Sequence, residues 1–403
     1  MPPDEWTRYR TAIEGEAFPV AIVDLAALNS NVDALVAAAH PKPLRIATKS
    51  IRCPELVRRI LERGGQRTHG LMTYTAAETA YLAEQGHDDL LLAYPTASAQ
   101  DATLLARANR SACARAVVDS TEHLALLDRA AQAEGTRVPV IVEMDLAYSP
   151  VSPLYLGVRR SPLHTTADVV ALVARIRDYA HLTFAGLMGY EAQIAGLPDA
   201  AGASEPFGTG VAKSAMKALS RRDVAQRRAD VARALEQGGL YGDHPLFNGG
   251  GTGSLASSAR EPALTELTAG SGFLDSHLFD GYRGLALTPA AYFALQVVRA
   301  PAPGIVTCHG GGFVASGSAG RDRLPLPSLP AGLGLLPLEG AGEVQTPLIV
   351  PAELTLGIGD PVFFRHAKAG ELAEHVREYL LIEGDRVVAR APTYRGLGLC
   401  FLG

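Results

Sequence analysis

Several residues able to do chemistry follow short apolar segments of this sequence. The segment LRIAT (44–48) is followed by Lys49, and Pro54 then opens an amphipathic segment. An amine at the end of a buried strand is partly desolvated, and a nearby Arg45 or Arg52 would favour its neutral form, which attacks carbonyl carbons. Lys49 is therefore a candidate for a Schiff base, although a solvated charge is the commoner role of a lysine at a strand end.

Two glycine-rich segments could bind the phosphate that a carbonyl cofactor such as pyridoxal phosphate carries. NGGGTGS (248–254) combines three consecutive glycines with the hydroxyls of Thr252 and Ser254. Glycine lets a backbone approach a ligand closely, and successive N–H groups can form an anion-binding nest. TAGSGF (268–273) follows the next apolar segment, so the two loops could clasp one phosphate. A flexible turn is the alternative interpretation of the first loop.

Strand-like and helical segments alternate along the chain, and these predicted elements would position Lys49 and the glycine-rich segments. Eight strand-like segments are separated by helical ones such as 53–65 and 75–86, the second opening with a Thr75–Glu78 capping box. The eight segments are LRIAT (44–48), GLMTY (70–74), LLLAY (90–94), RAVVD (115–119), PVIVEMD (139–145), FAGLMGY (184–190), PLFNGG (245–250) and ALTELTAG (263–270). They predict an α/β protein with a (β/α)8 barrel, whose chemistry lies at the C-terminal strand ends. A doubly wound sheet is the alternative, but no GxGxxG follows the first segment.

A second domain follows the barrel pattern. After residue 276 the sequence changes to Pro- and Gly-rich turns between short strands, which predicts an all-β domain. We therefore expect a barrel domain over 20–275 and a C-terminal β domain over 276–403, which residues 1–19 join. The segment AGASEPFGTGVAKSA (201–215) is predicted to be a loop after the sixth barrel strand that borders the active site.

Composition narrows the classes of partner. The 403 residues are 47% hydrophobic and 20% charged, with a formal net charge of -5. The sequence offers no basic face for nucleic acid and no apolar run near the roughly 20 residues of a membrane span. The N-terminus has no apolar signal segment, and the four cysteines form no CxxC pair. We expect a cytoplasmic protein with a small-molecule substrate and neither a nucleic-acid nor a membrane partner.

The order of segments resembles the fold-type III pyridoxal phosphate enzymes. The similarity is to the D-threonine aldolase and D-serine dehydratase group, within it to the amino acid deaminase/aldolase branch, on an alanine racemase-like barrel. The segments that carry it are FPVAIVDLAALNSNV, LRIATKSIRCPEL, VEMDLAY, GVRRSPL, GLMGYEAQIAGLPD, FNGGGTGS, ELTAGSGFLDSHLFD and GDPVFFRHAKAGEL. They extend over nearly the whole chain.

The resemblance implies roles for individual residues. Lys49 would carry the cofactor as a Schiff base, Tyr190 would lie beside the ring, and Arg160, with Arg159 as the alternative, would face the pyridine nitrogen. The implied phosphate-binding residues are Gly250, Gly251, Thr252, Gly270 and Ser271. A homodimer is implied, in which one subunit's β domain helps to close the other subunit's site.

The resemblance also implies the reaction. Through an external aldimine, a β-hydroxy-D-amino acid would undergo retro-aldol cleavage to glycine and an aldehyde, with Lys49 as one candidate base. A D-serine dehydratase-type deaminase and an amino acid racemase or epimerase are alternatives on the same scaffold. A third alternative is a non-enzymatic cofactor carrier, against which the second domain argues.

The metal site of some family members is incomplete here. Metal-dependent members hold a divalent ion with a His-x-Cys or His-x-Asp pair, whereas this chain has His366 and Lys368. A protonated lysine has no lone pair to donate, so His366 is the only candidate ligand and we expect no divalent metal. We hypothesise instead that the Lys368 ammonium polarises the β-hydroxyl or binds a substrate carboxylate, with His366 as acid or base. Asp145, at the end of the fifth strand, is a further candidate that would orient an arginine or the lysine.

Overall fold

Eight parallel strands close into a barrel. The computed structural model describes residues 4–151, 153–200, 208–243 and 245–402. The barrel strands are β2 (Leu44–Ala47), β3 (Thr68–Thr73), β4 (Asp89–Leu92), β5 (Cys113–Val118), β6 (Val138–Glu143), β7 (Leu182–Met188), β8 (Leu246–Gly249) and β9 (Glu266–Ala269). β9 pairs with β2, with Leu44 opposite Leu267, which closes the ring. The predicted barrel is confirmed, and the doubly wound alternative is wrong.

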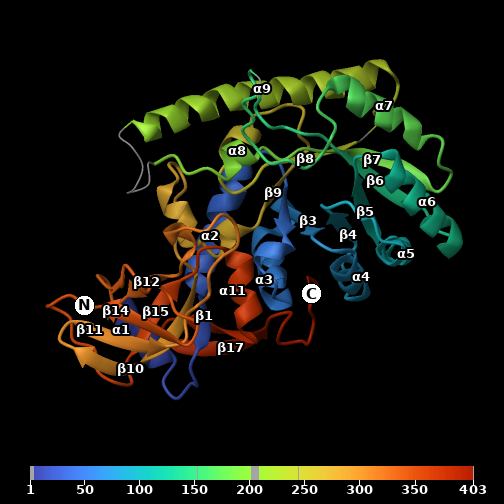
Figure 1. Ribbon diagram of the computed structural model, residues 1–403. Helices are drawn as coiled ribbons and strands as arrows, with labels where there is room; N and C mark the ends of the chain where they lie inside the picture. Colours follow the sequence, from blue (N-terminus) through green and yellow to red (C-terminus); the bar gives the residue numbers. More distant parts are fainter. Residues whose placement is uncertain (1–3, 152, 201–207, 244, 403) are drawn as a thin grey trace.

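Helices surround this barrel (Figure 1). They are α2 (Leu25–Ala39), α3 (Pro54–Gly64), α4 (Ala76–Glu84), α5 (Ala99–Ala108), α6 (Thr121–Glu134), α7 (Thr166–Ile176), α8 (Ala192–Ala195), α9 (Thr209–Gln237) and α10 (Leu255–Ser258). In α3, Pro54 occupies the first turn and Leu56, Val57 and Ile60 are buried, as the amphipathic pattern predicts. The capping box of α4 is only half formed: the Thr75 side chain accepts the Glu78 N–H, but the Glu78 carboxylate accepts the N–H of Tyr74.

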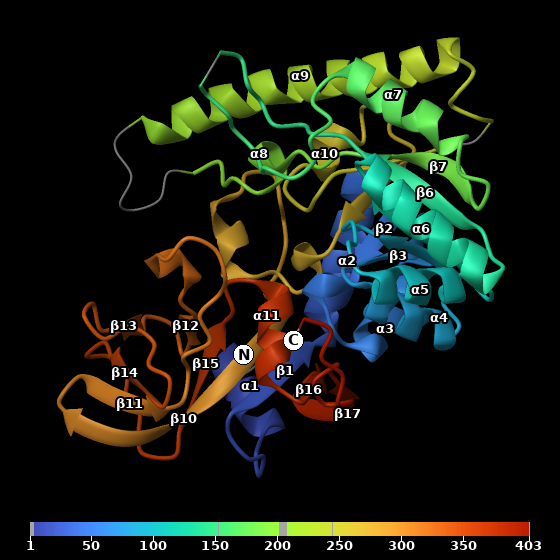
Figure 2. The same ribbon diagram turned by 45° about the vertical axis from the view of Figure 1, so that its right-hand side comes forward.

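The segment predicted as a loop over 201–215 is partly helical. Residues 209–215 form the first two turns of α9, and 201–207 lie outside the described residues. Alanine, lysine and methionine are good helix formers, and Gly210 stands in the first turn, where a glycine disturbs a helix least. Tertiary contacts add to this preference, because the Lys217 amine donates to Leu197 O at 2.8 Å and pairs with Asp199 at 2.7 Å. Figure 2 shows α9 lying across the barrel.

A nine-stranded sheet forms the second part of the molecule. Its strands are β1 (Val20–Asp24), β10 (Ala291–Ala302), β11 (Ile305–His309), β12 (Leu326–Leu329), β13 (Gly334–Leu335), β14 (Gln345–Ile349), β15 (Pro361–Arg365), β16 (Glu378–Glu383) and β17 (Arg386–Pro392). β1 lies in this sheet, antiparallel to β10 and parallel to β16, although the predicted barrel domain begins at residue 20. Helices α1 (Glu5–Ala12) and α11 (Ala369–His375) accompany the strands, and the Trp6 indole N–H donates to Pro361 O at 2.9 Å.

Short 3-10 turns connect these elements. They are η1 (Thr48–Ser50), η2 (Gly65–Arg67), η3 (Ser271–Phe273), η4 (His277–Gly281) and η5 (Arg321–Arg323). No helix in the described ranges has the length and apolar character needed to cross a membrane.

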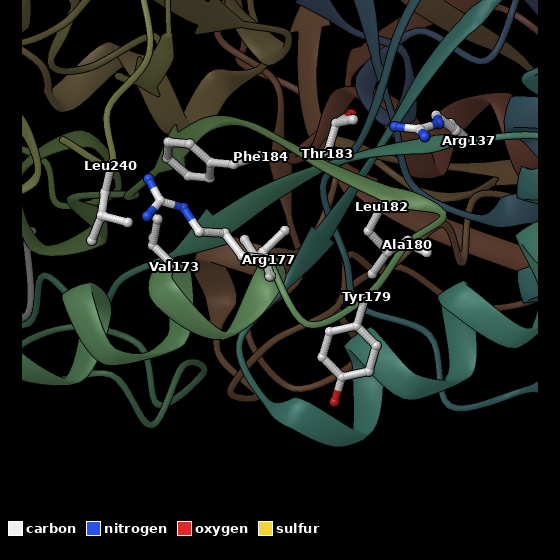
Figure 3. Close-up of a pocket in the computed structure, with 10 residues that line it drawn as sticks. Arg137, Val173, Arg177, Tyr179, Ala180, Leu182, Thr183, Phe184 and Leu240 are labelled. Atoms are coloured by element: carbon white, nitrogen blue, oxygen red, sulfur yellow. The ribbon is translucent and has the colours of Figure 1, made fainter.

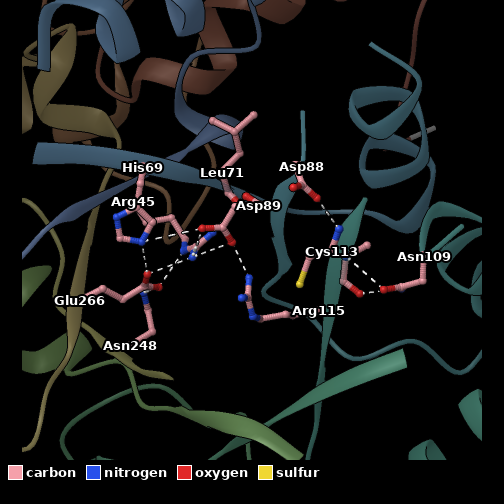
Figure 4. A network of polar contacts seen from close by, with 11 residues as sticks. Arg45, His69, Leu71, Asp88, Asp89, Asn109, Cys113, Arg115, Asn248 and Glu266 are labelled. Atoms are coloured by element: carbon pink, nitrogen blue, oxygen red, sulfur yellow. Dashed lines mark hydrogen bonds and ion pairs between the residues drawn. The ribbon is translucent and has the colours of Figure 1, made fainter. Parts of the chain in front are cut away.

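The barrel interior is charged at its N-terminal end (Figure 4). Arg45, only 1% exposed, donates from Nε to Glu266 Oε1 at 2.7 Å and from Nη2 to Asp89 Oδ1 at 3.0 Å. His69 and Asn248 also contact Glu266, each at 2.7 Å. Further toward the C-terminal ends of the strands the barrel interior is apolar. The buried side chains there include Leu91, Val117, Ile141 and Met188. The ion cluster closes the end of the barrel that lies opposite the predicted site.

Candidate active site

Lys49 lies where β2 ends, in the turn η1. Its side chain is exposed, and its Nζ donates to the Tyr94 hydroxyl at 2.7 Å. Tyr94 follows β4, so both side chains occupy the C-terminal end of the barrel, where barrels carry their chemistry. Sequence reasoning did not single out Tyr94, which is the last residue of the predicted strand 90–94 and lies two residues beyond the end of β4 in the structure.

The two arginines expected to act on the Lys49 amine contact other groups. The side chain of Arg45 points to the N-terminal end of the barrel, where it pairs with Glu266 and Asp89. Arg52 donates from Nε to the Lys49 carbonyl at 2.9 Å and pairs with Glu374 at 2.6 Å. Arg45 is therefore directed away from the amine, and the Arg52 guanidinium binds Glu374 and the Lys49 carbonyl rather than the amine.

Arg160 and Tyr190 join Lys49 and Tyr94 at this end of the barrel. The Arg160 Cζ lies 5.6 Å from the Tyr190 ring centroid and 6.0 Å from that of Tyr94, within the range of cation–π attraction. Arg159 instead lies over Tyr155, with its Cζ 4.2 Å from the ring centroid. The structure therefore favours Arg160 as the arginine of the site.

A carboxyl that sequence reasoning missed lies near Arg160. Glu143, the last residue of β6, is 5% exposed. Burial raises its pKa to about 7, although the positive charge of Arg160 opposes the shift. Near neutral pH this group can therefore hold or release a proton beside Arg160.

The two glycine-rich loops meet each other and the Lys49 turn. Thr252 Oγ1 accepts the N–H of Gly272 at 3.1 Å, and the Ser50 and Ser271 hydroxyls are 3.1 Å apart. A Cβ on Gly270 would lie 2.7 Å from Ser50 Oγ, and one on Gly251 would lie 3.0 Å from Tyr190 Cε2. Any side chain at these glycines would fill the space between the two loops and the tyrosine.

Backbone N–H groups of these loops divide into two sets. Gly250 N–H donates to Glu191 Oε2 at 3.2 Å, and Gly251 N–H donates to Ser254 Oγ at 3.1 Å. The N–H groups of Thr252, Gly253 and Ser271 donate to no residue that the structure describes. The second set can therefore bind an anion, whereas Gly250 and Gly251 serve the site by lacking a side chain.

Asp145 is directed toward a loop and has no hydrogen bond to Lys49. Its Oδ1 accepts from the Tyr155 hydroxyl at 2.8 Å, and its Oδ2 lies 3.1 Å from His164 Nδ1. Tyr155 and His164 belong to the loop that carries Arg160. Among the described residues the Asp145 carboxylate therefore contacts neither an arginine side chain nor Lys49, and its predicted role in orienting one of them stays a prediction.

His366 and Lys368 differ in their access to the site. His366 is 3% exposed, neither ring nitrogen has a hydrogen-bond partner among the described residues, and burial lowers its pKa to about 3. Lys368 is half-buried and lies 3.4 Å from Ser316 Oγ. Two residues later, a Cβ on Gly370 would lie 1.9 Å from Lys49 O, so α11 packs directly on the lysine turn. Lys368 therefore borders the Lys49 site, while His366 lies beneath the surface.

A cavity of about 420 Å³ lies at another place (Figure 3). Its walls include Arg137, Arg177, Phe184 and Leu240, and it opens at the start of β7, opposite the strand ends that carry Tyr190. This cavity is separate from the residues predicted to do chemistry.

Solved structures show the same fold. D-Threonine aldolase from Filomicrobium marinum is 20% identical, with a TM-score of 0.79 over 94% of this chain and 95% of that chain. D-threo-3-Hydroxyaspartate dehydratase from Delftia sp. HT23 is 17% identical, with a TM-score of 0.73 over 95% and 98% of the two chains. An alanine racemase-like protein from Idiomarina loihiensis is 16% identical, with a TM-score of 0.72 over 98% and 99%.

Sequence comparison identifies the family. A search of curated proteins found no match. The family model described as alanine racemase, N-terminal domain, matches residues 23–242, more than half of the chain. These residues include Lys49, Arg160 and Tyr190. The chain therefore belongs to the alanine racemase N-terminal domain family.

Proposed function

We propose that this protein is a pyridoxal phosphate-dependent lyase that cleaves β-hydroxy-D-amino acids to glycine and an aldehyde. The observation that carries the proposal is the contact of the Lys49 turn with the second glycine-rich loop, which in turn contacts the first loop at the same end of the barrel. The alanine racemase-like fold family uses pyridoxal phosphate, which supports an enzyme with this cofactor. The aldolase reaction is proposed from the resemblance and from the structural neighbour that is a D-threonine aldolase.

The residues present fit the cofactor. Lys49 would hold its aldehyde carbon, and the free N–H groups of Thr252, Gly253 and Ser271 would hold its phosphate. Arg160 and Tyr190 would contact its ring. When bound, pyridoxal phosphate supplies an electron sink for the bond that breaks at the substrate α-carbon.

Side chains of this protein would then manage charge and protons. If Arg160 faces the pyridine nitrogen, as the resemblance implies, its positive charge would disfavour protonation of that nitrogen, which would suit reactions with a short-lived carbanion. The Lys49 amine, which donates to the Tyr94 hydroxyl, would accept the proton of a substrate β-hydroxyl when the amine is free of the cofactor.

Lys368 would bind the substrate rather than a metal. Its position at the start of α11, beside the Lys49 turn, supports the proposal that its ammonium contacts the β-hydroxyl or a substrate carboxylate. His366 is less suited to the acid role, because a buried neutral imidazole has no proton to spare near pH 7. Among the described residues no three His, Cys, Asp or Glu side chains cluster as metal ligands do, and a divalent metal is not part of the proposal.

Dehydration is the second candidate reaction. D-threo-3-Hydroxyaspartate dehydratase shares the fold over nearly the full chain. A cation such as Lys368 beside the substrate could assist departure of the β-hydroxyl as readily as it could assist its deprotonation. The product would then be an oxo acid and ammonia instead of glycine and an aldehyde.

The decisive experiment combines absorption spectra with product analysis. Purified protein supplied with pyridoxal phosphate is scanned before and after addition of D-threonine, and glycine, acetaldehyde, oxo acid and ammonia are assayed. Lys49→Ala should abolish both the Schiff-base band and turnover, whereas Lys42→Ala, at the other end of β2, should preserve them. Glycine and acetaldehyde support the aldolase, and oxo acid and ammonia support the dehydratase. A wild-type protein without the band would refute the cofactor assignment.

A homodimer in the cytoplasm stays a prediction of the sequence, as does the absence of nucleic-acid and membrane partners. Light scattering of the purified protein tests the dimer.

A further inference from the structure

A buried ion triad lies behind the first glycine-rich loop. Glu191 directly follows Tyr190 and is 1% exposed, and Arg228 of α9 is fully buried. The Arg228 guanidinium pairs with Glu191, donates to Gly189 O at 2.7 Å and donates to both carboxylate oxygens of Glu261 at 2.8 Å. Burying these charges is costly, so the full set of partners is needed to keep them ionised.

Glu191 holds the loop at both of its ends. Its Oε2 accepts the N–H of Gly250 at 3.2 Å. Its Oε1 accepts from the hydroxyl of Ser254 at 2.7 Å and from that of Ser258 at 2.6 Å. Ser254 Oγ in turn accepts the N–H of Gly251. The Glu191 carboxylate thus binds the Gly250 N–H and the hydroxyls of Ser254 and Ser258 directly, and it holds the Gly251 N–H through Ser254.

The charge of Glu191 matters for this arrangement. Burial favours its neutral form, but the attraction of Arg228 and the serine hydroxyls outweighs burial and holds the pKa of Glu191 below its usual value. A carboxylate accepts hydrogen bonds on both oxygens, whereas an amide in its place has an NH₂ group that cannot accept. Replacement by glutamine therefore breaks contacts on one side of the loop without removing volume.

We propose that Glu191 is a positioning residue that shapes the loop Gly250–Ser254 to bind phosphate. By engaging the N–H groups of Gly250 directly and Gly251 through Ser254, it leaves those of Thr252 and Gly253 for the ligand. Because Glu191 follows Tyr190 in the chain, it also ties this loop to the tyrosine proposed to contact the ring. The inference rests on the proposed cofactor and not on the reaction.

The test compares two ligands that differ only in phosphate. Dissociation constants of pyridoxal phosphate and pyridoxal are measured by absorbance titration of cofactor-free wild-type protein, Glu191→Gln and Glu261→Gln. The Glu261→Gln control alters the same triad, but in the structure Glu261 has no hydrogen bond to the loop. We expect Glu191→Gln to weaken binding of pyridoxal phosphate about tenfold or more and to leave pyridoxal binding within about twofold. Glu261→Gln should keep the wild-type ratio of the two constants.

Several results would overturn the inference. One is an unchanged ratio of the two dissociation constants in Glu191→Gln, whether both ligands bind as in the wild type or both bind equally more weakly. Another is the same change of this ratio in Glu261→Gln. If Glu191→Gln does not fold, Ser254→Ala and Ser258→Ala remove its contacts singly, and an unchanged ratio in both would likewise reject the role. A wild-type protein with no preference for pyridoxal phosphate would instead refute the proposed cofactor. Binding without lyase activity would leave the inference standing while the proposed reaction fails.

Discussion

Arg159 and Arg160 are adjacent in the sequence but contact different rings. Arg160 lies within cation–π range of both Tyr94 and Tyr190, and Tyr94 is the hydrogen-bond partner of the Lys49 amine, whereas Arg159 lies over Tyr155. Both residues are exposed, so burial does not distinguish them. Their surroundings do, because of the two arginines Arg160 is the one close to Tyr190 and Tyr94, where the proposed cofactor ring would lie.

Arg160→Gln should lower kcat for D-threonine by about a hundredfold, a magnitude typical of losing one electrostatic group at a reacting centre. Binding of pyridoxal phosphate should weaken much less, because the phosphate loops and Lys49 remain. The measurement is steady-state kinetics together with a cofactor titration. Arg159→Gln is the matched control and should stay within about threefold of wild type. Similar losses in the two variants would show that the pair acts by general positive charge.

At the scale of elements, the barrel separates two kinds of interior. Charged side chains of Arg45, Asp89 and Glu266 fill the N-terminal end, and Lys49, Tyr94 and Arg160 stand at the C-terminal end. Burial opposes ionisation of Glu266, but attraction by Arg45 and hydrogen bonds from His69 and Arg45 outweigh it and lower the pKa to about 2. The Glu266 carboxylate therefore stabilises the folded barrel and does not take part in the proposed reaction.

The shift of Glu266 predicts a pH dependence of stability. The carboxyl of a glutamate has a pKa of roughly 4.3 in the unfolded chain, and the pKa of Glu266 in the folded protein is lower. The stabilisation that ionised Glu266 gives the folded state is therefore complete above the unfolded pKa and is lost as the pH falls toward about 2. Each pH unit in this window should change the free energy of unfolding by up to about 1.4 kcal/mol through this group.

Glu266→Gln should flatten that acid limb and lower the free energy of unfolding near pH 7 by about 3 kcal/mol, since the buried Arg45 loses its main partner. Urea unfolding at a series of pH values measures both effects. Glu84→Gln, which alters an exposed carboxylate at the end of α4, is the control and should leave the profile unchanged. An acid limb of wild-type slope in Glu266→Gln would contradict the assignment.

Across the whole molecule, the second sheet helps to shape the lysine turn. Arg52 has a positive φ of 50° and donates to Lys49 O, and its guanidinium pairs with Glu374 of α11. The N–H of Tyr394, which follows β17, donates to Arg52 O at 2.8 Å, and its hydroxyl donates to Glu78 Oε1 at 2.9 Å. The barrel and the sheet thus share one hydrogen-bonded network directly behind Lys49.

Arg52→Gln should therefore affect stability and activity together. We expect the free energy of unfolding to fall by roughly 2 kcal/mol, because Glu374 and the Lys49 carbonyl lose a partner. We also expect kcat to fall because the lysine turn loses support from the sheet. Urea unfolding measures the free energy of unfolding, and steady-state kinetics with D-threonine measures kcat. Arg59→Gln is the control, because Arg59 pairs with Glu55 on the surface. Full activity in a destabilised Arg52→Gln protein would show that the network serves stability alone.

Strand periodicity, glycine-rich loops and turn residues are local signals, and they were sufficient to predict the barrel, the β domain and the position of Lys49 at a strand end. The sequence also placed the glycine loops at adjacent strand ends, and their contact is confirmed. It did not identify Tyr94, Glu143 or Glu191, since a tyrosine or a glutamate near the end of a strand looks the same in the sequence whether its side chain packs, forms an ion pair or binds a ligand. The first turns of α9 were also missed, because glycine and serine around residues 202–210 mask helix formers that tertiary contacts such as Lys217 with Asp199 stabilise.

Which charged side chains form ion pairs depends on long-range packing. Arg45 and Arg52 both stand within four residues of Lys49, yet the first points to the far end of the barrel and the second to α11. Strand alternation and the docking of the second sheet set these directions, and both depend on residues more than 200 positions away in the chain. Spacing along the sequence therefore indicated where chemistry lies, and long-range packing determined which side chains can take part in it.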